Sequence, residues 1–155
     1  MCELLKNQNY KNLSTTEMRT LRKLDEKMGK QNEYYVDGIL EKYFNKKIYK
    51  FKNYYSVFDF YTEEGDYIEL KSRRTTINNY PTQLIGANKI DKAKQLLKEK
   101  KIKHFYLVYK LNDGIYIWDY DPIVVLQTKM LGNWTRGDKS CELYLIPNIL
   151  LTKIK

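Results

Sequence analysis

Residues 57–73, VFDFYTEEGDYIELKSR, have the pattern of a β-hairpin, and the expected fold depends on them. Both arms are rich in aromatic and β-branched residues, and the link between them contains one glycine, Gly65. If residues 63–65 form the loop, with Gly65 in the left-handed conformation, Asp59 lies directly opposite Glu69. The register of the hairpin therefore decides whether these two carboxylates can meet.

Side chains alternate between the two faces of a strand, so this register divides the hairpin into two sets. One face carries Asp59, Tyr67, Glu69 and Lys71, and the other carries Phe58, Phe60, Ile68 and Leu70. A loop of two or four residues would move Asp59 to the face opposite Glu69, unless a bulge restored the phase. Only the three-residue loop gives a coherent core, so we expect one apolar face and one charged face.

Two carboxylates with Cβ atoms about 5 Å apart repel each other, and burial raises the pKa of one of them unless a cation lies between them. Mg²⁺ is a suitable cation, because it binds a few carboxylate oxygens and keeps waters that substrate phosphates can replace. Lys71 follows Glu69 by two residues on the same face, where an ammonium could polarise a water or neutralise charge on phosphorus. This pattern favours hydrolysis of phosphodiester bonds.

Asp59, nine intervening residues and then Glu69-Leu70-Lys71, placed between apolar strands, resemble the motif of the PD-(D/E)xK nuclease superfamily. The residue before the aspartate is often proline in that motif, and here it is Phe58. The spacing is also similar to that of small phage or viral endonucleases of the Holliday junction resolvase type, which cut four-way DNA junctions.

This resemblance implies an α/β, restriction-endonuclease-like core. In such a core a helix, a three-stranded meander, a second helix and a strand build a mixed central sheet flanked by helices. The implied metal is Mg²⁺ or Mn²⁺, and its implied ligands are Glu33, Asp59, Glu69 and the carbonyl oxygen of Leu70. Lys71 would orient or activate the attacking water, and the products would carry a 5′-phosphate and a 3′-hydroxyl.

The chain has 155 residues, which fits a single domain over residues 1–155. Its 28 Lys and Arg residues exceed its 19 Asp and Glu residues, and the net charge of +9 favours a polyanionic partner. DNA is the first candidate, and simple solubility is the alternative reason for the charge. Cys2 and Cys141 lie far apart without CxxC spacing, so the sequence predicts neither a zinc site nor a disulfide.

The N-terminal residues lack the apolar run of a signal peptide, and no stretch of about 18 uncharged apolar residues occurs. We therefore expect a soluble intracellular protein without a membrane partner. It would be located in the cytoplasm or, if it is viral, in the cytoplasm or nucleus of the host.

Two helices are expected before the hairpin. Residues 14–17, Ser-Thr-Thr-Glu, have capping-box spacing, so a first helix is predicted over residues 15–28, ending at Gly29. Asn32 can cap a second helix with an apolar stripe formed by Val36, Ile39, Leu40, Tyr43 and Phe44. Glu33 lies at the edge of this stripe, where either a metal site or the dipole of a first helical turn would explain a carboxylate.

The remaining segments supply further strands and a helix. Residues 48–55 alternate and should form the first strand of the meander, whereas residues 75–88 should form a polar connection beside the site. Asn88 is expected to cap a helix that runs to about Lys101. Residues 105–109 are uninterruptedly apolar, as in a strand buried on both faces, and residues 115–120 should pair with them in antiparallel fashion.

We expect residues 1–14 to form a flexible arm, residues 32–110 to form the catalytic core and residues 111–155 to extend it with C-terminal strands. Within this extension, residues 123–126 could be a strand or a short helix, and residues 141–146 should be a strand.

Several residues are candidates for contacts with nucleic acid. Arg73 and Arg74 follow the Glu-x-Lys at the catalytic edge, where guanidinium groups could bind phosphates, although a solvated strand end is the alternative. The resemblance suggests that Gln83 or Lys89 assists the site from the following helix. The loop of residues 132–140 carries Trp134 and Arg136, a stacking surface and a cation that suit nucleic acid, although Trp134 could equally be a packing or dimer anchor.

The first hypothesis is a Mg²⁺-dependent DNA endonuclease that selects DNA shape, such as a branched junction, because the chain is too short for a separate recognition domain. Cutting both strands would require a homodimer. The second hypothesis is a non-catalytic nucleic-acid-binding or virion-associated protein on a nuclease-like scaffold. A third, an unrelated basic α/β protein with a chance motif, predicts that Asp59 and Glu69 point to different faces.

Overall fold

The computed structural model describes residues 14–53, 56–131 and 141–155. Its elements, in chain order, are α1 (Thr15–Phe44), β1 (Tyr49–Lys50), β2 (Phe60–Tyr61), β3 (Asp66–Ser72), the short 3₁₀ helix η2 (Ile77–Asn79), β4 (Thr82–Gly86), α2 (Ala87–Lys98), β5 (His104–Leu111), β6 (Gly114–Asp119), β7 (Gln127–Leu131), β8 (Cys141–Pro147), the 3₁₀ helix η4 (Asn148–Leu150) and β9 (Thr152–Lys153). The predicted α/β class is confirmed. The expected arm, apart from Ser14, and Arg136 lie outside the described residues.

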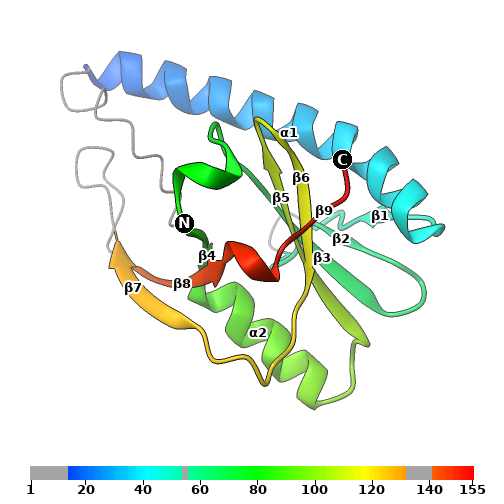
Figure 1. Ribbon diagram of the computed structural model, residues 1–155. Helices are drawn as coiled ribbons and strands as arrows, with labels where there is room; N and C mark the ends of the chain where they lie inside the picture. Colours follow the sequence, from blue (N-terminus) through cyan, green and yellow to red (C-terminus); the bar gives the residue numbers. More distant parts are fainter. Residues whose placement is uncertain (1–13, 54–55, 132–140) are drawn as a thin grey trace.

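Two sheets are present in the described part of the chain. The larger has the strand order β1-β2-β3-β5-β6-β9, and the smaller has the order β4-β8-β7. In the larger sheet β3 is parallel to β5 and every other pairing is antiparallel, so the sheet is mixed, as predicted. Helix α1 covers one face of the larger sheet, and α2 covers the opposite face beside the smaller sheet (Figure 1). The mixed sheet is thus flanked by helices.

Helix α1 begins with the predicted capping box. The Ser14 hydroxyl accepts the N–H of Glu17, and the Glu17 carboxylate accepts the N–H of Ser14. The expectation of two helices is wrong, because α1 continues through Gly29 to Phe44. An interior glycine costs about 1 kcal/mol, and a contact distant in sequence, from Arg74 to Asp25 at 3.1 Å, helps to hold this half of the helix in place.

Because α1 is continuous, Glu33 does not lie at the predicted start of a second helix. This residue lies well inside the helix and not in a first turn, so the helix dipole does not account for its position. The predicted start of the catalytic core at residue 32 also falls inside α1. The residues on both sides of position 32 therefore belong to one continuous helix.

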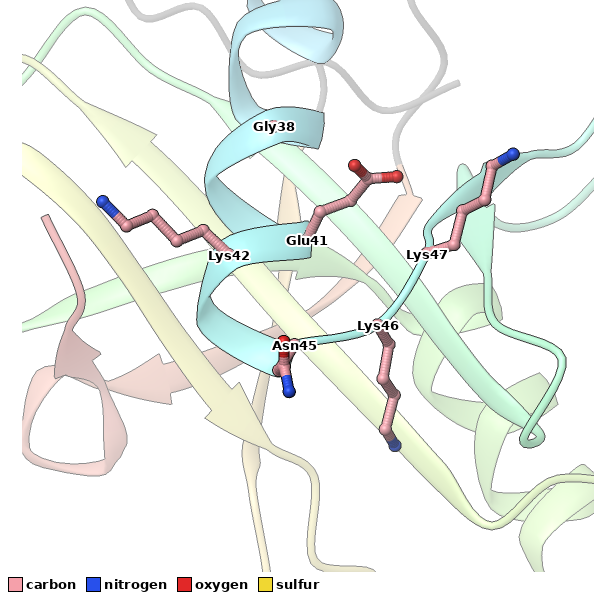
Figure 2. Close-up of a pocket in the computed structure, with 6 residues that line it drawn as sticks. All are labelled: Gly38, Glu41, Lys42, Asn45, Lys46 and Lys47. Atoms are coloured by element: carbon pink, nitrogen blue, oxygen red, sulfur yellow. The ribbon is translucent and has the colours of Figure 1, made fainter.

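The C-terminal end of α1 is tied to the hairpin. The helix ends at Asn45, which adopts a left-handed conformation with φ 52°, and Lys46 extends from the segment that follows (Figure 2). The Lys46 ammonium lies 2.6 Å from a Glu64 oxygen and 3.1 Å from an Asp66 oxygen. The buried Asp66 carboxylate also accepts the Thr62 hydroxyl at 2.7 Å. Because the opposite end of α1 contacts the residues that follow β3, the helix runs antiparallel to β3.

The predicted register of the hairpin is confirmed next to the loop, but it does not continue to Asp59, which therefore does not lie directly opposite Glu69. Phe60 pairs with Ile68, and Gly65 has a φ of 93°, in the left-handed region that favours glycine. Before β2 the ladder shifts by one residue, because the Asp59 N–H bonds to the Ile68 carbonyl at 3.1 Å. This local bulge turns Phe58 to the face of Tyr67 and away from Phe60, so the predicted grouping of Phe58 with Phe60 is wrong.

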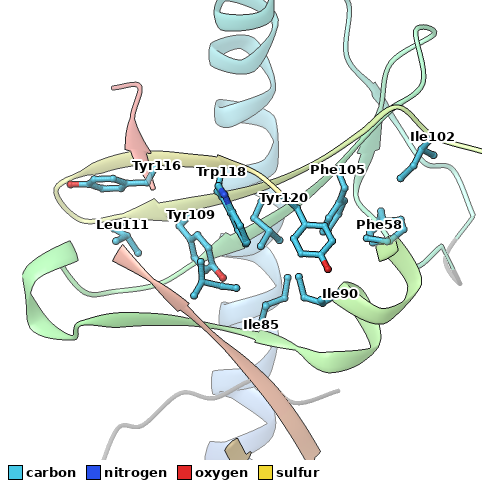
Figure 3. Close-up of a cluster of buried hydrophobic side chains, with 13 residues drawn as sticks. Phe58, Ile85, Ile90, Ile102, Phe105, Tyr109, Leu111, Tyr116, Trp118 and Tyr120 are labelled. Carbon is cyan, nitrogen blue, oxygen red and sulfur yellow. The ribbon is translucent and has the colours of Figure 1, made fainter. Parts of the chain in front are cut away.

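Both faces of the larger sheet are packed, which corrects the expectation of one apolar and one charged face. The cluster under α1 comprises Val36, Leu40, Ile48, Phe60, Ile68, Leu70, Val108, Ile115 and Ile117. The cluster on the α2 side comprises Phe58, Ile85, Ile90, Ala93, Ile102, Phe105, Leu107, Tyr109, Leu111, Tyr116, Trp118, Tyr120 and Ile146 (Figure 3). The second cluster joins the two sheets into one core. Glu69 and Lys71 lie on its face, since they alternate with Ile68 and Leu70.

Several connections differ from the prediction. The expected polar connection contains β4, which pairs with β8, so a strand of the second sheet stands between β3 and α2. Gly86 and not Asn88 caps α2, and residues 123–126 form neither a strand nor a helix. Cys141 is disulfide-bonded, contrary to expectation, and Cys2 lies outside the described residues.

The expectations for strands β5, β6 and β8 are confirmed. Strand β5 is buried and parallel to β3, β6 pairs with β5 in antiparallel fashion, and β8 forms a strand. In the described residues, helices that combine the length and the apolar character needed to cross a bilayer are absent.

Candidate active site

The Asp59 side chain lies at the point where β2 and β3 separate. Its Oδ2 accepts the N–H of Leu70 at 2.8 Å, a bond that occupies the place of a ladder hydrogen bond beyond the bulge. The carboxylate is therefore held against the middle of β3. The three-residue loop fixes the pairing of β2 with β3, and the bulge before β2 then directs the Asp59 side chain to the N–H of Leu70.

Asp59 is in an unfavourable environment for a charge. Its pKa is raised to about 7, chiefly by burial and next by the negative charge of Glu69. The N–H of Leu70 and the ammonium of Lys71 act in the opposite direction, and the carboxylate of Glu33 adds a smaller upward effect. All of these groups are thus near enough to Asp59 to influence its titration.

Glu69 is almost completely buried, and each of its carboxylate oxygens contacts a lysine. Its Oε1 lies 3.0 Å from the Lys71 ammonium, and its Oε2 lies 3.2 Å from the Lys89 ammonium. Lys71 belongs to β3, whereas Lys89 is in the first turn of α2. The structure therefore brings a strand and a helix together around one carboxylate.

Glu33 approaches from the opposite face of the sheet. It lies on α1 and forms an ion pair with Lys50 of β1. Its effect on the pKa of Asp59 places it near the site, but its carboxylate contacts Lys50 and not Lys71. The predicted convergence of Glu33, Asp59 and Glu69 is thus only partial.

The donor atoms at this site suit a hard divalent cation. Asp59 and Glu69 offer carboxylate oxygens, and a positive charge beside them would relieve the repulsion that raises the pKa of Asp59. Among the residues that the structure describes, three or more acidic, histidine or cysteine side chains do not gather in an arrangement that could hold a metal ion. The carboxylates of Glu33, Asp59 and Glu69 are instead each bound by a lysine or a backbone N–H.

The residues predicted to contact nucleic acid lie in different environments. Arg73 donates to the carbonyl of Ser72, and Arg74 is exposed and paired with Asp25 of α1, so both lie at the end of β3 beyond Lys71. Gln83 is buried in β4 and donates to the Asn148 side chain at 3.1 Å, away from solvent.

The sequence did not identify Lys50 as a residue near the site, and it suggested for Lys89 only a general assisting role. The alternating pattern of residues 48–55 placed Lys50 in a strand, but the partner of its ammonium depends on the path of α1. Lys89 looked like one of many lysines on an exposed helix, and the signal that could have distinguished it is its position in the first turn.

A hollow on the surface lies elsewhere. It is lined by Gly38, Glu41, Lys42, Asn45, Lys46 and Lys47 at the C-terminal end of α1 (Figure 2). Asp59 and Glu69 do not line it, and Lys46 is already paired with two carboxylates. The chemistry of the hairpin is therefore a better guide to the active site than the shape of this surface.

Comparison with known proteins identifies the family of the chain. The searches of curated proteins and of solved structures gave no match to the chain. Residues 19–146 match the family described as Phage putative PDDEXK endonuclease, and this range contains the hairpin, most of α1, all of α2 and all of the predicted site residues. Since the match covers most of the chain, the protein belongs to the family of phage putative PDDEXK endonucleases.

Proposed function

We propose that the protein is a divalent-metal-dependent endonuclease that hydrolyses DNA phosphodiester bonds, with Mg²⁺ or Mn²⁺ as the metal. The observation that carries this proposal is the closeness of the half-buried Asp59, just before β2, to the buried Glu69 of β3, with the Lys71 ammonium on Glu69. Membership of a PDDEXK endonuclease family supports it, because nucleases of this type generally use divalent metals.

The residues have distinct proposed roles. Asp59, Glu69 and the Leu70 carbonyl would hold the metal, with Glu33 as a further ligand once its carboxylate leaves Lys50. When bound, the metal supplies a positive charge that stabilises the phosphate in the transition state. Lys71, already fixed beside Glu69, orients the attacking water and favours its deprotonation.

The substrate is proposed to be DNA of a particular shape, such as a four-way junction. Both sheets share one hydrophobic core. The net charge of +9 favours binding to DNA phosphates regardless of the DNA sequence. Arg73 and Arg74, just beyond Lys71, are the proposed contacts with the backbone, and Arg136 and Lys89 are further candidates. A homodimer would place two sites on the two strands that a resolvase cuts.

The test is a cleavage assay on supercoiled, linear and four-way-junction DNA, with Mg²⁺, with Mn²⁺ and with EDTA. The wild type should cut the junction fastest and should be inactive in EDTA. Asp59→Asn should lose at least about a hundredfold in rate, because it removes a metal-binding charge. Glu26→Gln, an exposed change on α1, should cut at the wild-type rate. Equal cutting by Asp59→Asn and the wild type would overturn the site assignment.

A non-catalytic nucleic-acid-binding or virion-associated role is the second candidate. The pairing of Glu33 and Glu69 with lysines favours it, because these contacts satisfy the carboxylates without a metal. This role predicts binding to DNA with no cleavage under any metal condition, and equal affinity for the wild type and Asp59→Asn. Metal-dependent cutting by the wild type would exclude it.

A further inference from the structure

Lys89 is placed differently from the other lysines of α2. Its side chain is 20% exposed, similar to the 19% of Lys71, whereas Lys92, Lys94 and Lys98 are exposed. Its ammonium contacts Glu69 Oε2 at 3.2 Å and donates to the backbone carbonyl of Val57. Lys89 is therefore a built part of the site and not a residue of the solvated helix face.

The position of Lys89 is not explained by the helix. A cation in the first turn is unfavourable, because the N-terminal end of a helix carries a partial positive charge. The first turn of α2 contains no acidic residue, and its N-cap, Gly86, makes no side-chain hydrogen bond. The contacts with Glu69 and with the Val57 carbonyl are thus the interactions that favour a lysine here.

The oxygens around the Lys89 ammonium are of the kind that a divalent cation uses. One is a carboxylate oxygen of Glu69 and the other is the carbonyl oxygen of Val57, two residues before Asp59. Mg²⁺ and Mn²⁺ prefer carboxylate and carbonyl oxygens. An ammonium and a divalent ion that both bind Glu69 would repel each other strongly at short distance.

We propose that Lys89 is an internal cation that competes with the divalent metal for Glu69 and so sets the metal affinity of the site. The inference rests on the proposed metal-dependent function. Lys71 lies on the same strand as Glu69 and contacts the other carboxylate oxygen, Oε1, whereas Lys89 contacts Oε2. Lys89 comes from another element, and its long flexible side chain can withdraw from the carboxylate by changing rotamer. Binding of the metal is then coupled to the contacts between α2 and the segment before β2.

The test measures metal affinity directly and does not depend on cleavage. Mn²⁺ is titrated into the full chain and free Mn²⁺ is followed by electron paramagnetic resonance. Lys89→Met should bind Mn²⁺ about tenfold or more tightly than the wild type, because the competing charge is gone. Lys89→Arg, which keeps the charge, should resemble the wild type, as should the exposed control Lys94→Met. Thermal unfolding in EDTA establishes that each variant is folded.

The outcomes separate this inference from the function on which it rests. The competition is supported if Lys89→Met binds Mn²⁺ more tightly than the wild type and if adding Glu69→Gln to this variant abolishes the tighter binding. If the wild type binds Mn²⁺ through Glu69 but Lys89→Met binds equally or more weakly, the competition is refuted and the metal site stands. If Glu69→Gln binds Mn²⁺ as the wild type does, or if none of the proteins binds it, the metal site and the competition are both refuted.

Discussion

Replacing Asp59 by asparagine is expected to stabilise the metal-free protein, and to do so more at alkaline than at acidic pH. The pKa of Asp59 is about 7 in the folded protein, compared with 3.8 for an unperturbed aspartate. Because the folded-state pKa is the higher one, the folded state binds this proton more tightly than the unfolded state. The contribution of this proton to the free energy of unfolding is fully present below about pH 4 and is lost as the pH rises through 7. A difference of about three pKa units corresponds to about 4 kcal/mol at pH 8.

The assay is urea-induced unfolding of both proteins at pH 5 and pH 8 in EDTA. The amide oxygen of the new side chain can still accept the N–H of Leu70, and it carries no charge to repel Glu69. The free energy of unfolding of Asp59→Asn, relative to the wild type, should rise by about 2–3 kcal/mol between pH 5 and pH 8. Glu26→Gln, an exposed change, should show no such difference between the two pH values.

A relative stability of Asp59→Asn that does not vary with pH would refute this reasoning, because it would mean that Asp59 titrates normally and is not held beside Glu69. Mg²⁺ should reverse the order of the two proteins at pH 8, since added metal would stabilise the wild type through its Asp59 carboxylate and would not stabilise the variant in the same way. An equal response of both proteins to Mg²⁺ would count against a metal site at Asp59.

Three further predictions concern the hairpin and its edge. Thr62→Val should lower the free energy of unfolding by about 1–3 kcal/mol, because the buried Asp66 loses its hydroxyl donor; urea unfolding measures this, and a change below about 0.5 kcal/mol would contradict it. Gly65→Ala should lower it by about 1 kcal/mol through backbone strain alone, since an added Cβ would meet only ordinary contacts with Lys103; an unchanged urea midpoint would show that the turn tolerates a side chain. In the Asp59→Asn background, Arg73→Ala should reduce the salt dependence of DNA affinity by about one phosphate contact, measured by fluorescence anisotropy over a series of salt concentrations, and an unchanged slope would remove Arg73 from the interface.

The amino-acid sequence by itself determined the features that depend on neighbouring residues. The capping box at Ser14 follows from its spacing to Glu17, and the register of the hairpin follows from Gly65 in a three-residue loop. The buried strand β5 follows from an uninterrupted apolar run. Each of these is a local rule in which the side chain or backbone preference of a few residues selects one conformation.

The tertiary structure decided where distant residues meet. Helix α1 continues through Gly29 although a glycine is a poor helix former, and contacts with the end of β3 compensate. A one-residue bulge at Asp59 moves Phe58 to the other face of the sheet, which alternation alone does not foresee.

The ion pairs of the site show most clearly what local sequence determines and what the tertiary structure decides. The sequence identified Asp59, Glu69 and Lys71 because they share one hairpin, but the contacts of Glu69 with Lys89 and of Glu33 with Lys50 join elements that are far apart in the chain. No local pattern specifies such pairs, because they depend on how the two helices pack against opposite faces of the sheet. The sequence alone therefore determined that Asp59 and Glu69 share one hairpin, and only the folded chain decided how they are oriented and which cations bind the carboxylates.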